Sequence, residues 1–425
     1  MLRAALRRGA GALVRGRHGV AVAGARGAMS GAGAGAQQGG HGAGAVNGAA
    51  RAAPGPAAGG RNPSPGLTGE EKFLFDAAGY FVARQVRPRW APSRPFAVAA
   101  SSSSGHPHLP RPATASGADG SPSDARFPRR PPAPRDDAQV FSPAEVEEMK
   151  AAVEAHEAGF AERKDALRLS GDSTATTLTG DGSTGRKDLG GCLGWPEPYC
   201  QPFRRLLHHP GLIPYIHSIV GSGYRLDHMP LIIRQEKGAE GFHLHGGSTL
   251  ENGDWDHSLT YGVYNGEIRT NLLGMTVQLT DVGPGDGGFA IMPGSHKANF
   301  PCPKSLKNME QYTDYLLQPE TKAGDVVFFS EAASHGTMAW NADHTRTACI
   351  IRFAPSYLAY GRAYTPEWSP EMLEGMTDAQ RAVLQPPYHE RLDRPVLNID
   401  GSAQEGKYST MKKNFNEKVF KNKYY

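Results

Sequence analysis

The chain lacks several features that would place it in a familiar class. No run approaches the length of about 18–20 apolar residues that spans a bilayer, and no segment repeats at a fixed period. Only four cysteines are present among 425 residues, and none of them forms a C-x-x-C pair. They are too sparse for a disulfide framework and are typical of a reducing compartment. These absences predict a soluble intracellular protein with one sizeable core.

Acidic residues and lysine are missing from the N-terminus. Residues 1–69 hold eight arginines and 19 of the 53 glycines, with no Lys, Asp or Glu before Glu70. An arginine-rich, acid-free start is typical of an organellar transit peptide, and we predict a mitochondrial one, with plastid or cytoplasm as alternatives. The rest of the chain has four more acidic than basic residues, which argues against a nucleic-acid-binding body.

Composition divides the chain into ordered and low-complexity parts. The stretch from 93 to 138 is rich in Ser, Pro and Gly without periodicity, which predicts a disordered insertion or, alternatively, an error in the gene model such as a retained intron. Order returns where Ser142, Pro143 and Glu145 form a helix-start pattern. The predicted parts are a disordered N-terminus (1–69), the start of a domain (70–92), the insertion (93–138), a main domain (139–360) and a helical and irregular extension (361–425).

The main domain shows the pattern of an antiparallel β-protein. One short helix is predicted at LIPYIHSIV, and several short runs rich in Val, Ile, Phe and Thr alternate with turn residues. Such spacing favours a sandwich or barrel over a parallel sheet. The predicted strands are YRLDHMPLIIRQ, NLLGMTVQLTDV, GGFAIMPGSH, GDVVFFSEAASH and RTACIIRFAPSYL.

Two histidine neighbourhoods lie where predicted strands meet turns. One is GFHLHGG, with His243 and His245, and the other is SHGT, with His335. Arg346 follows His335 by eleven residues, with the turn sequence WNADH between them, so we expect antiparallel neighbouring strands that bring both side chains into one pocket. Imidazoles suit Fe, Zn or Cu, and a guanidinium binds a carboxylate through two hydrogen bonds.

At this point the sequence resembles the phytanoyl-CoA dioxygenase superfamily, the iron(II)- and 2-oxoglutarate-dependent oxygenases. The resemblance covers residues of about 70–90 and 140–356 and depends on a combination of motifs. These are YRLDH at 224–228, LHGG at 244–247, LTDVGPGDGGFAIMPGSHK at 279–297, and GDVVFFSEAASHGTMAW at 324–340 with Arg346. The Pro293–His296 part is interpreted as a structural turn.

The resemblance implies a mainly β fold, the double-stranded β-helix or jelly roll, with Fe(II), 2-oxoglutarate and dioxygen as cofactor and co-substrates. It also implies that His245 and His335 bind the iron and that Arg346, supported by Thr337, binds the far carboxylate of 2-oxoglutarate. Two further side chains, Thr276 and Gln278, share one strand face and are candidates for the same pocket or for a cross-strand polar pair. Arg352, six residues after Arg346, is a rival for the anion site.

One departure from the family pattern leaves the third iron ligand open. The family's H-x-D motif has Gly247 where the aspartate would stand. The first alternative is a carboxylate from elsewhere: Glu331, which we place on the strand face of His335, or Glu251, Asp254 or Asp256. The second is a site without a protein carboxylate, as in iron halogenases. The third is a three-histidine site that includes His243.

The function predicted from these features is hydroxylation of an unidentified small-molecule or lipid-like substrate, with decarboxylation of 2-oxoglutarate to succinate. A chloride-using halogenase and a non-catalytic barrel that binds zinc or another ligand are the alternatives. The sequence near the site residues lacks a cluster of Lys and Arg that could bind the phosphates of coenzyme A, so we do not predict a coenzyme A substrate. Asp227 and His228 either face the substrate or form a satisfied buried pair.

Overall fold

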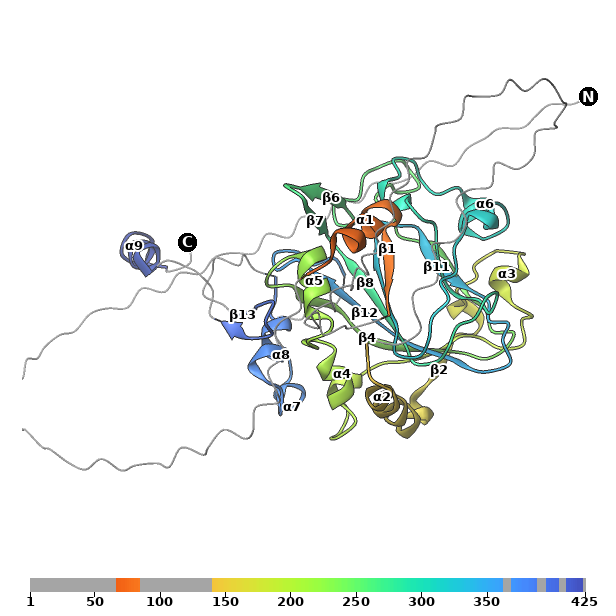
Figure 1. Cartoon of the computed structure of the whole chain (residues 1–425), viewed down its shortest axis with the longest axis horizontal. Coiled ribbons are helices and arrows are strands. Elements are labelled where there is room, and N and C mark those ends of the chain that lie inside the picture. The colour runs from red at the N-terminus through yellow and green to blue at the C-terminus, as the bar shows by residue number, and fades with distance from the viewer. Residues whose placement is uncertain (1–65, 85–139, 362–367, 388–394, 405–409, 423–425) are drawn as a thin grey trace, which may run out of the picture. The chain divides into compact units, whose positions relative to one another are not determined.

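The computed structural model describes residues 66–84, 140–361, 368–387, 395–404 and 410–422 (Figure 1). The predicted transit peptide and the 93–138 insertion lie outside these residues and stay predictions. The helices are α1 (Gly69–Ala78), α2 (Pro143–Ala155), α3 (Thr176–Thr179), α4 (Gln201–Arg205), α5 (Ile213–Val220), α6 (Lys304–Lys307), α7 (Pro370–Leu373), α8 (Asp378–Val383) and α9 (Thr410–Phe420).

Fourteen strands form the sheets of the described part. They are β1 (Tyr80–Ala83), β2 (Ala161–Glu162), β3 (Lys187–Leu189), β4 (Arg225–Gln235), β5 (Phe242–His245), β6 (Tyr261–Tyr264), β7 (Glu267–Thr270), β8 (Leu273–Gln278), β9 (Gly288–Ile291), β10 (Val326–Ser330), β11 (His335–Met338), β12 (Arg346–Ala354), β13 (Val396–Leu397) and β14 (Ala403–Gln404). All five predicted strand runs and the predicted helix at 213–220 are therefore present.

Two antiparallel sheets make the central body. The major sheet has the order β1-β10-β8-β12-β4-β3-β2, and the minor sheet has the order β5-β11-β9. They pack through apolar side chains: the Phe289 ring of β9 lies 4.8 Å from the Phe329 ring of β10, between ring centroids. Ile291 and Val327 belong to the same buried cluster. This is the predicted double-stranded β-helix.

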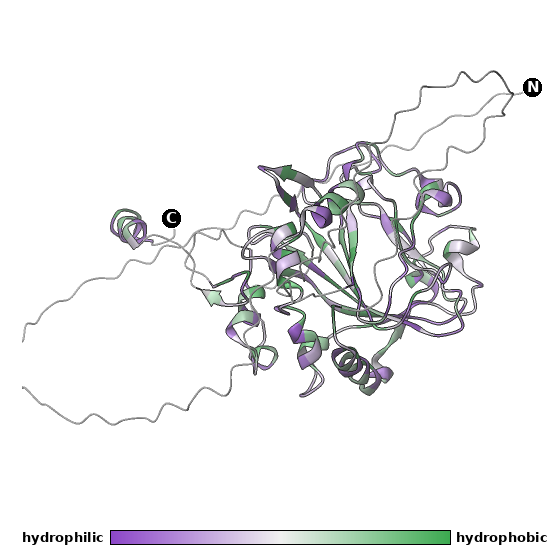
Figure 2. Ribbon diagram, in the orientation of Figure 1, coloured by the Kyte–Doolittle hydropathy of each residue, from purple (hydrophilic) through white to green (hydrophobic). Residues whose placement is uncertain are grey.

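The other face of the major sheet carries the larger core. Met275 and Val277 of β8 are fully buried there and alternate with Thr276 and Gln278, which face the minor sheet. Helices α1, α2 and α5 contribute to this core, and Figure 2 shows green, apolar residues on both the helices and the strands. The interior between the two sheets is therefore where polar side chains of the central strands meet.

Helix boundaries follow the sequence signals. Ser142 caps α2 and receives the backbone N–H of Glu145, whose carboxylate in turn accepts the backbone N–H of Ser142, as the pattern predicts. Thr68 and Glu71 form the same reciprocal cap on α1. None of the helices in the described ranges combines the length and apolar character that a membrane span requires.

One expectation about the fold is wrong. The turn at 340–344 does not join neighbouring strands, because β11 pairs with β5 and β9 whereas β12 pairs with β4 and β8. The connection carries the chain from the minor sheet to the major sheet. His335 and Arg346 thus belong to opposite walls of the interior instead of one hairpin.

Packing in the larger core predicts a large difference between two phenylalanines. Phe328 is fully buried and stacks on Phe81 with 5.1 Å between ring centroids, whereas Phe300 is 84% exposed. We expect Phe328→Ala to lower the free energy of unfolding by about 3–5 kcal/mol, and Phe300→Ala to change it by less than about 0.5 kcal/mol. Urea denaturation followed by circular dichroism measures both, and similar values for the two variants would contradict this packing.

Candidate functional site

Three side chains that can bind a metal meet between the sheets. His245 ends β5, His335 begins β11, and Glu331 lies in the turn after β10. One ligand atom from each lies within 4.8 Å of the others, and the two imidazole centroids are 4.3 Å apart. Glu331 and His335 are buried, and His245 is half-buried. Two imidazoles and one carboxylate on one side of a metal, with the other side open, are the ligand set of non-haem iron(II) oxygenases.

Backbone carbonyls orient both imidazoles in the same way. His245 Nδ1 bonds the carbonyl of His243 at 3.1 Å, and His335 Nδ1 bonds the carbonyl of Ala333 at 2.9 Å. A carbonyl accepts, so Nδ1 carries the proton in each ring and Nε2 keeps its lone pair. His335 Nε2 is buried and has no hydrogen-bond partner among the described residues. That orphaned acceptor fits a metal ligand.

The charges at the cluster also suit a divalent cation. Burial lowers the pKa of His335 and lowers that of His245 well below its usual value, so both rings are neutral. For Glu331, burial favours the protonated form, but the charge and hydrogen bond of the Arg352 guanidinium oppose burial, and the pKa is lowered to about 2. Arg352 Nε donates to Glu331 Oε1, while Oε2 lies 3.5 Å from His335 Nε2. One carboxylate oxygen is therefore held by Arg352, and the other faces the histidines.

Two glycines explain how Glu331 reaches His245. A Cβ at Gly246 would lie 2.5 Å from the carbonyl oxygens of both Glu331 and Ala333, and Gly247 has φ +94° and donates its N–H to the Glu331 carbonyl. Only glycine fits this close approach without strain. Our expectation that Glu331 shares a strand face with His335 is wrong, because β10 ends at Ser330 and a turn separates the two residues.

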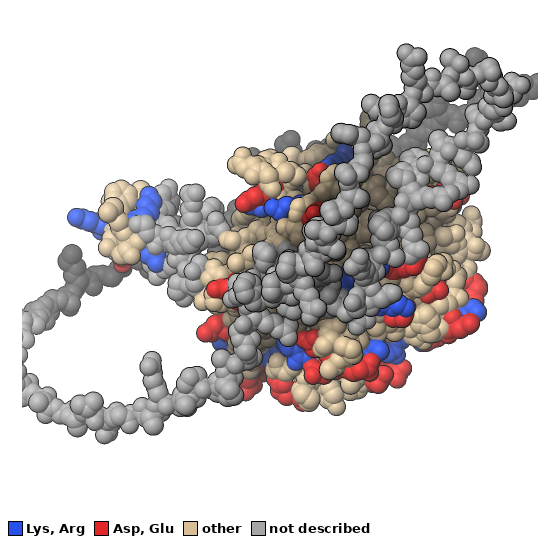
Figure 3. All heavy atoms as spheres, in the orientation of Figure 1, with Lys and Arg blue, Asp and Glu red and all other residues tan. Residues whose placement is uncertain are grey.

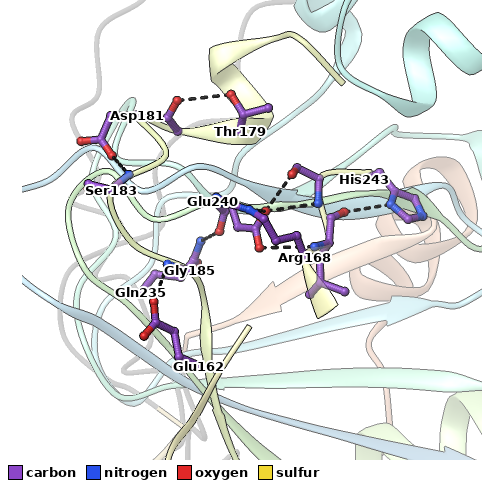
Figure 4. Close-up of polar contacts among 12 residues, drawn as sticks. Glu162, Arg168, Thr179, Asp181, Ser183, Gly185, Gln235, Glu240 and His243 are labelled. Carbon is purple, nitrogen blue, oxygen red and sulfur yellow. Dashed lines mark hydrogen bonds and ion pairs between the residues drawn. The ribbon is translucent and has the colours of Figure 1, made fainter. Parts of the chain in front are cut away.

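His243 is not part of the cluster of three candidate metal ligands among the described residues. Its Nδ1 bonds the carbonyl of Leu169 at 2.9 Å (Figure 4). The segment that contains Leu169 is fixed by the fully buried Glu240, which accepts hydrogen bonds from Arg168 Nε at 3.1 Å and Ser170 Oγ at 2.7 Å. His243 is therefore placed by a structural contact and lies outside the group.

The acidic candidates of the following loop are also engaged elsewhere. Glu251 binds Lys307, the Asp254 backbone and carboxylate pair with Asn252, and Asp256 accepts from Ser258. Of the carboxylates considered from the sequence, Glu331 is thus the one that the fold brings to the two histidines.

Arg346 lies in the same interior, at the start of β12. Its side chain is buried, one terminal nitrogen donates to Gln235 Oε1 at 2.8 Å, and Nε has no partner in the described part of the chain. Burial, with Arg186 nearby, lowers the pKa of Arg346 to about 10, so it stays a cation at neutral pH. A Cβ at Gly288 would lie 2.8 Å from Arg346 Nε, so this glycine makes room for the guanidinium. Such a buried cation is suited to a carboxylate.

The other predicted pocket residues line the same space. Gln278 lies opposite Ala348 and Thr276 opposite Ile350, which places both on the interior rows that continue from Arg346. Gln278 Oε1 is buried without a partner among the described residues. Thr337 lies on β11, opposite Phe289 of the strand that Gly288 begins. The structure therefore gathers all four predicted co-substrate residues on the interior walls.

The sequence reasoning missed one residue of this region and gave another a different role. Gln235, the last residue of β4, holds Arg346 and also donates to the Glu240 carbonyl at 2.9 Å. Arg352, interpreted as a rival anion site, is instead the ion-pair partner of Glu331. Gln235 follows the apolar run at 229–233 of a strand that also carries charged residues, so its role had no distinct signal in the sequence. The Arg352–Glu331 contact joins residues 21 positions apart and has no local signature either.

The fold is a double-stranded β-helix, and this cluster is a candidate metal centre with the ligand types of an oxygenase. The sequence profile of the family Phytanoyl-CoA dioxygenase (PhyH) matches residues 135–348, and the chain belongs to this family. Iron(II), 2-oxoglutarate and dioxygen are the cofactor and co-substrates of this family. The matched range contains His245, Glu331, His335 and Arg346 and ends before Arg352.

Solved structures show a more distant likeness. HygX from Streptomyces hygroscopicus, with nickel, 2-oxoglutarate and hygromycin B bound, is 19% identical with a TM-score of 0.47, over 72% of this chain and 94% of that one. EctD from S. alaskensis with 2-oxoglutarate and 5-hydroxyectoine is 16% identical with a TM-score of 0.39, over 69% and 78%. SnoK, a carbocyclase from nogalamycin biosynthesis, is 16% identical with a TM-score of 0.38, over 68% and 85%. No curated protein sequence matched.

Replacing the carboxylate tests its place in the metal centre. We expect Glu331→Gln to weaken iron(II) binding at least about tenfold, because the amide supplies no charge to the cation. Glu157→Gln, which removes an exposed carboxylate bound to Arg234, is the matched control and should leave the affinity unchanged. Anaerobic equilibrium dialysis measures both, and equal iron affinity of Glu331→Gln and wild type would remove Glu331 from the centre.

Arg346 allows a second test, directed at the co-substrate. We expect Arg346→Gln to raise the KM for 2-oxoglutarate at least about tenfold, because a charge-assisted carboxylate contact contributes about 1.5–3 kcal/mol. Iron affinity should not change. Arg234→Gln, which alters the arginine on the opposite face of the neighbouring strand, is the control. An unchanged KM in Arg346→Gln would contradict this assignment.

Proposed function

We propose that this chain hydroxylates a small or lipid-like substrate with iron(II), 2-oxoglutarate and dioxygen, and converts 2-oxoglutarate to succinate and carbon dioxide. Its oxidoreductase class follows from the family, while the reaction outcome and the substrate are the proposal. The observation that carries it is the group of His245, Glu331 and His335, buried or half-buried on the interior that also contains the Arg346 cation.

Each side chain has a defined task in this proposal. His245 and His335 present Nε2 lone pairs to the metal, and Glu331 presents Oε2 while Arg352 retains Oε1. Arg346 binds the far carboxylate of the co-substrate. When bound, iron(II) with 2-oxoglutarate and dioxygen supplies the oxidising power that attacks a C–H bond.

Exclusion of water is the remaining contribution of the chain. Phe289 and Phe329 stand beside His335, with ring centroids at 6.1 Å and 4.6 Å, and both phenylalanines are at most 8% exposed. These rings keep one side of the centre dry, so that the polar groups act in a medium of low dielectric constant. The open side, towards half-buried His245, is left for the substrate.

Because Gly247 stands where the family has an aspartate, a chloride-using iron halogenase is the second candidate function. A residue without a carboxylate after H-x is the feature expected of an iron halogenase, in which a halide takes the vacant ligand position. Here the fold gives another reason for a glycine at position 247. Its positive φ and its hydrogen bond to the Glu331 carbonyl belong to the turn that places Glu331 beside the histidines. With Glu331 as a ligand the proposal favours hydroxylation over halogenation.

A barrel that binds zinc without redox chemistry is the candidate from another class. A zinc site needs no second cation, whereas the interior holds Arg346 with its Nε and the Gln278 oxygen both buried without partners in the described part. Buried polar atoms are normally hydrogen-bonded, so these orphans favour a bound co-substrate.

Acidic and basic side chains are interspersed over the described surface in Figure 3, so that face carries no large field of one sign.

Turnover without a known substrate tests the proposal directly. We expect the purified full chain to form succinate from 2-oxoglutarate in air with Fe(II), and to form none with Zn(II) or without oxygen. A parallel series with and without chloride distinguishes a hydroxylase from a halogenase, because only the halogenase should depend on chloride. A folded, iron-loaded protein that forms no succinate would favour the non-catalytic barrel.

A further inference from the structure

Two polar side chains face each other on the interior next to the metal centre. His228 of β4 lies directly opposite Arg352 of β12, and Arg352 in turn lies opposite Gly274 of β8. Because Arg352 binds Glu331, this row belongs to the end of the interior that holds the three metal-binding candidates. We call His228 and Arg352 the polar pair.

Each member of the polar pair keeps unused hydrogen-bonding capacity. His228 Nδ1 bonds the Met229 carbonyl at 2.7 Å and therefore carries the proton, and the Nε2 lone pair has no partner among the described residues. Burial lowers the pKa of His228, so the ring is neutral and Nε2 accepts. Arg352 uses Nε for Glu331, and its two terminal nitrogens have no hydrogen-bond partner in the described segments. One acceptor and several donors therefore lie side by side.

The neighbouring Asp227 shows what a purely structural residue looks like here. Its carboxylate accepts from Arg225 at 3.0 Å and from the backbone N–H groups of Tyr360 and Gly361 at 3.0 and 3.1 Å. Both carboxylate oxygens are engaged, and the two backbone bonds tie the segment after β12 to β4. Of the two residues considered from the sequence, Asp227 is thus satisfied and His228 is not.

The apolar cluster beside the candidate metal site is closed by its own packing. Phe289, Ile291, Val327 and Phe329 pack against one another, and none of them is more than 8% exposed. An acyl chain would have to displace this packed cluster, whereas a polar molecule finds the polar pair already in place. The described residues at this end therefore favour a hydrogen-bonding substrate over a lipid.

We propose that the polar pair binds a hydroxyl group of the substrate, and that the substrate class is small molecules that carry a hydroxyl group. In this arrangement His228 Nε2 accepts the hydroxyl hydrogen, and a terminal N–H of Arg352 donates to the hydroxyl oxygen. The proposal rests on the proposed oxygenase function and replaces the broader small or lipid-like class with a narrower one.

The test uses full-chain enzyme and three hydroxylated probes (sorbitol, myo-inositol and glucosamine) against octanoyl-coenzyme A. We expect at least one hydroxylated probe to raise the rate of iron-dependent succinate formation and to bind the nickel- and 2-oxoglutarate-loaded protein in calorimetry. His228→Phe keeps a ring of similar size but has no acceptor, and should lower kcat/KM for that probe and its affinity at least about tenfold. The amide oxygen of His228→Gln should restore both to within about threefold.

Controls separate this inference from the proposed function. Succinate formation by the wild type without any probe reports on the oxygenase alone, so its absence would count against the proposed function and not against the polar pair. His217→Phe, on α5 and bonded to the Leu397 carbonyl, controls for the loss of a half-buried histidine. Stimulation by octanoyl-coenzyme A alone, no stimulation by any hydroxylated probe, or an undiminished response in His228→Phe would each overturn the assignment while leaving the oxygenase intact.

Discussion

The ion pair between Glu331 and Arg352 is the contact on which the rest of the site depends. A carboxylate that is only 3% exposed is costly to ionise unless a cation faces it, and removing one partner from such a pair typically costs about 3–5 kcal/mol. Arg352 meets that requirement from one side, and the two histidines on the other side stay neutral. The second oxygen of Glu331 is thus left as the negatively charged group that a divalent metal needs.

This charge arrangement requires strands from both sheets. The histidines come from β5 and β11 of the minor sheet, while Arg352 and Arg346 come from β12 of the major sheet. Glu331 stands in the turn that carries the chain from β10 in one sheet to β11 in the other. The crossing between sheets, more than any single strand, assembles the centre. It also explains the glycines at Gly246 and Gly288, where backbone or guanidinium atoms come too close for a Cβ, and at Gly247, whose φ is positive.

Local sequence signals predicted the elements well and their partners poorly. Alternation along β8 correctly separated Met275 and Val277 from Thr276 and Gln278, and the cap at Ser142 marked the start of α2, because both patterns depend on near neighbours. The WNADH turn looked like a hairpin, yet hydrogen bonding over longer separations placed β11 and β12 in different sheets. Glu331 was named as a ligand through an incorrect strand argument, since its approach depends on a turn and a glycine contact that periodicity does not encode.

Strand β12 shows how one element can divide two tasks. Its interior residues run from Arg346 through Ala348 and Ile350 to Arg352, with a cation at each end and apolar side chains between them. Arg346 is hydrogen-bonded to a neutral amide, so its positive charge is not neutralised by a carboxylate. The charge of Arg352 is neutralised by Glu331, and its terminal nitrogens remain as hydrogen-bond donors. The first is therefore suited to a charged carboxylate and the second to a neutral hydroxyl. A substrate with its own carboxylate would compete with Glu331 for Arg352, so in the proposed site this ion pair would also disfavour acidic substrates.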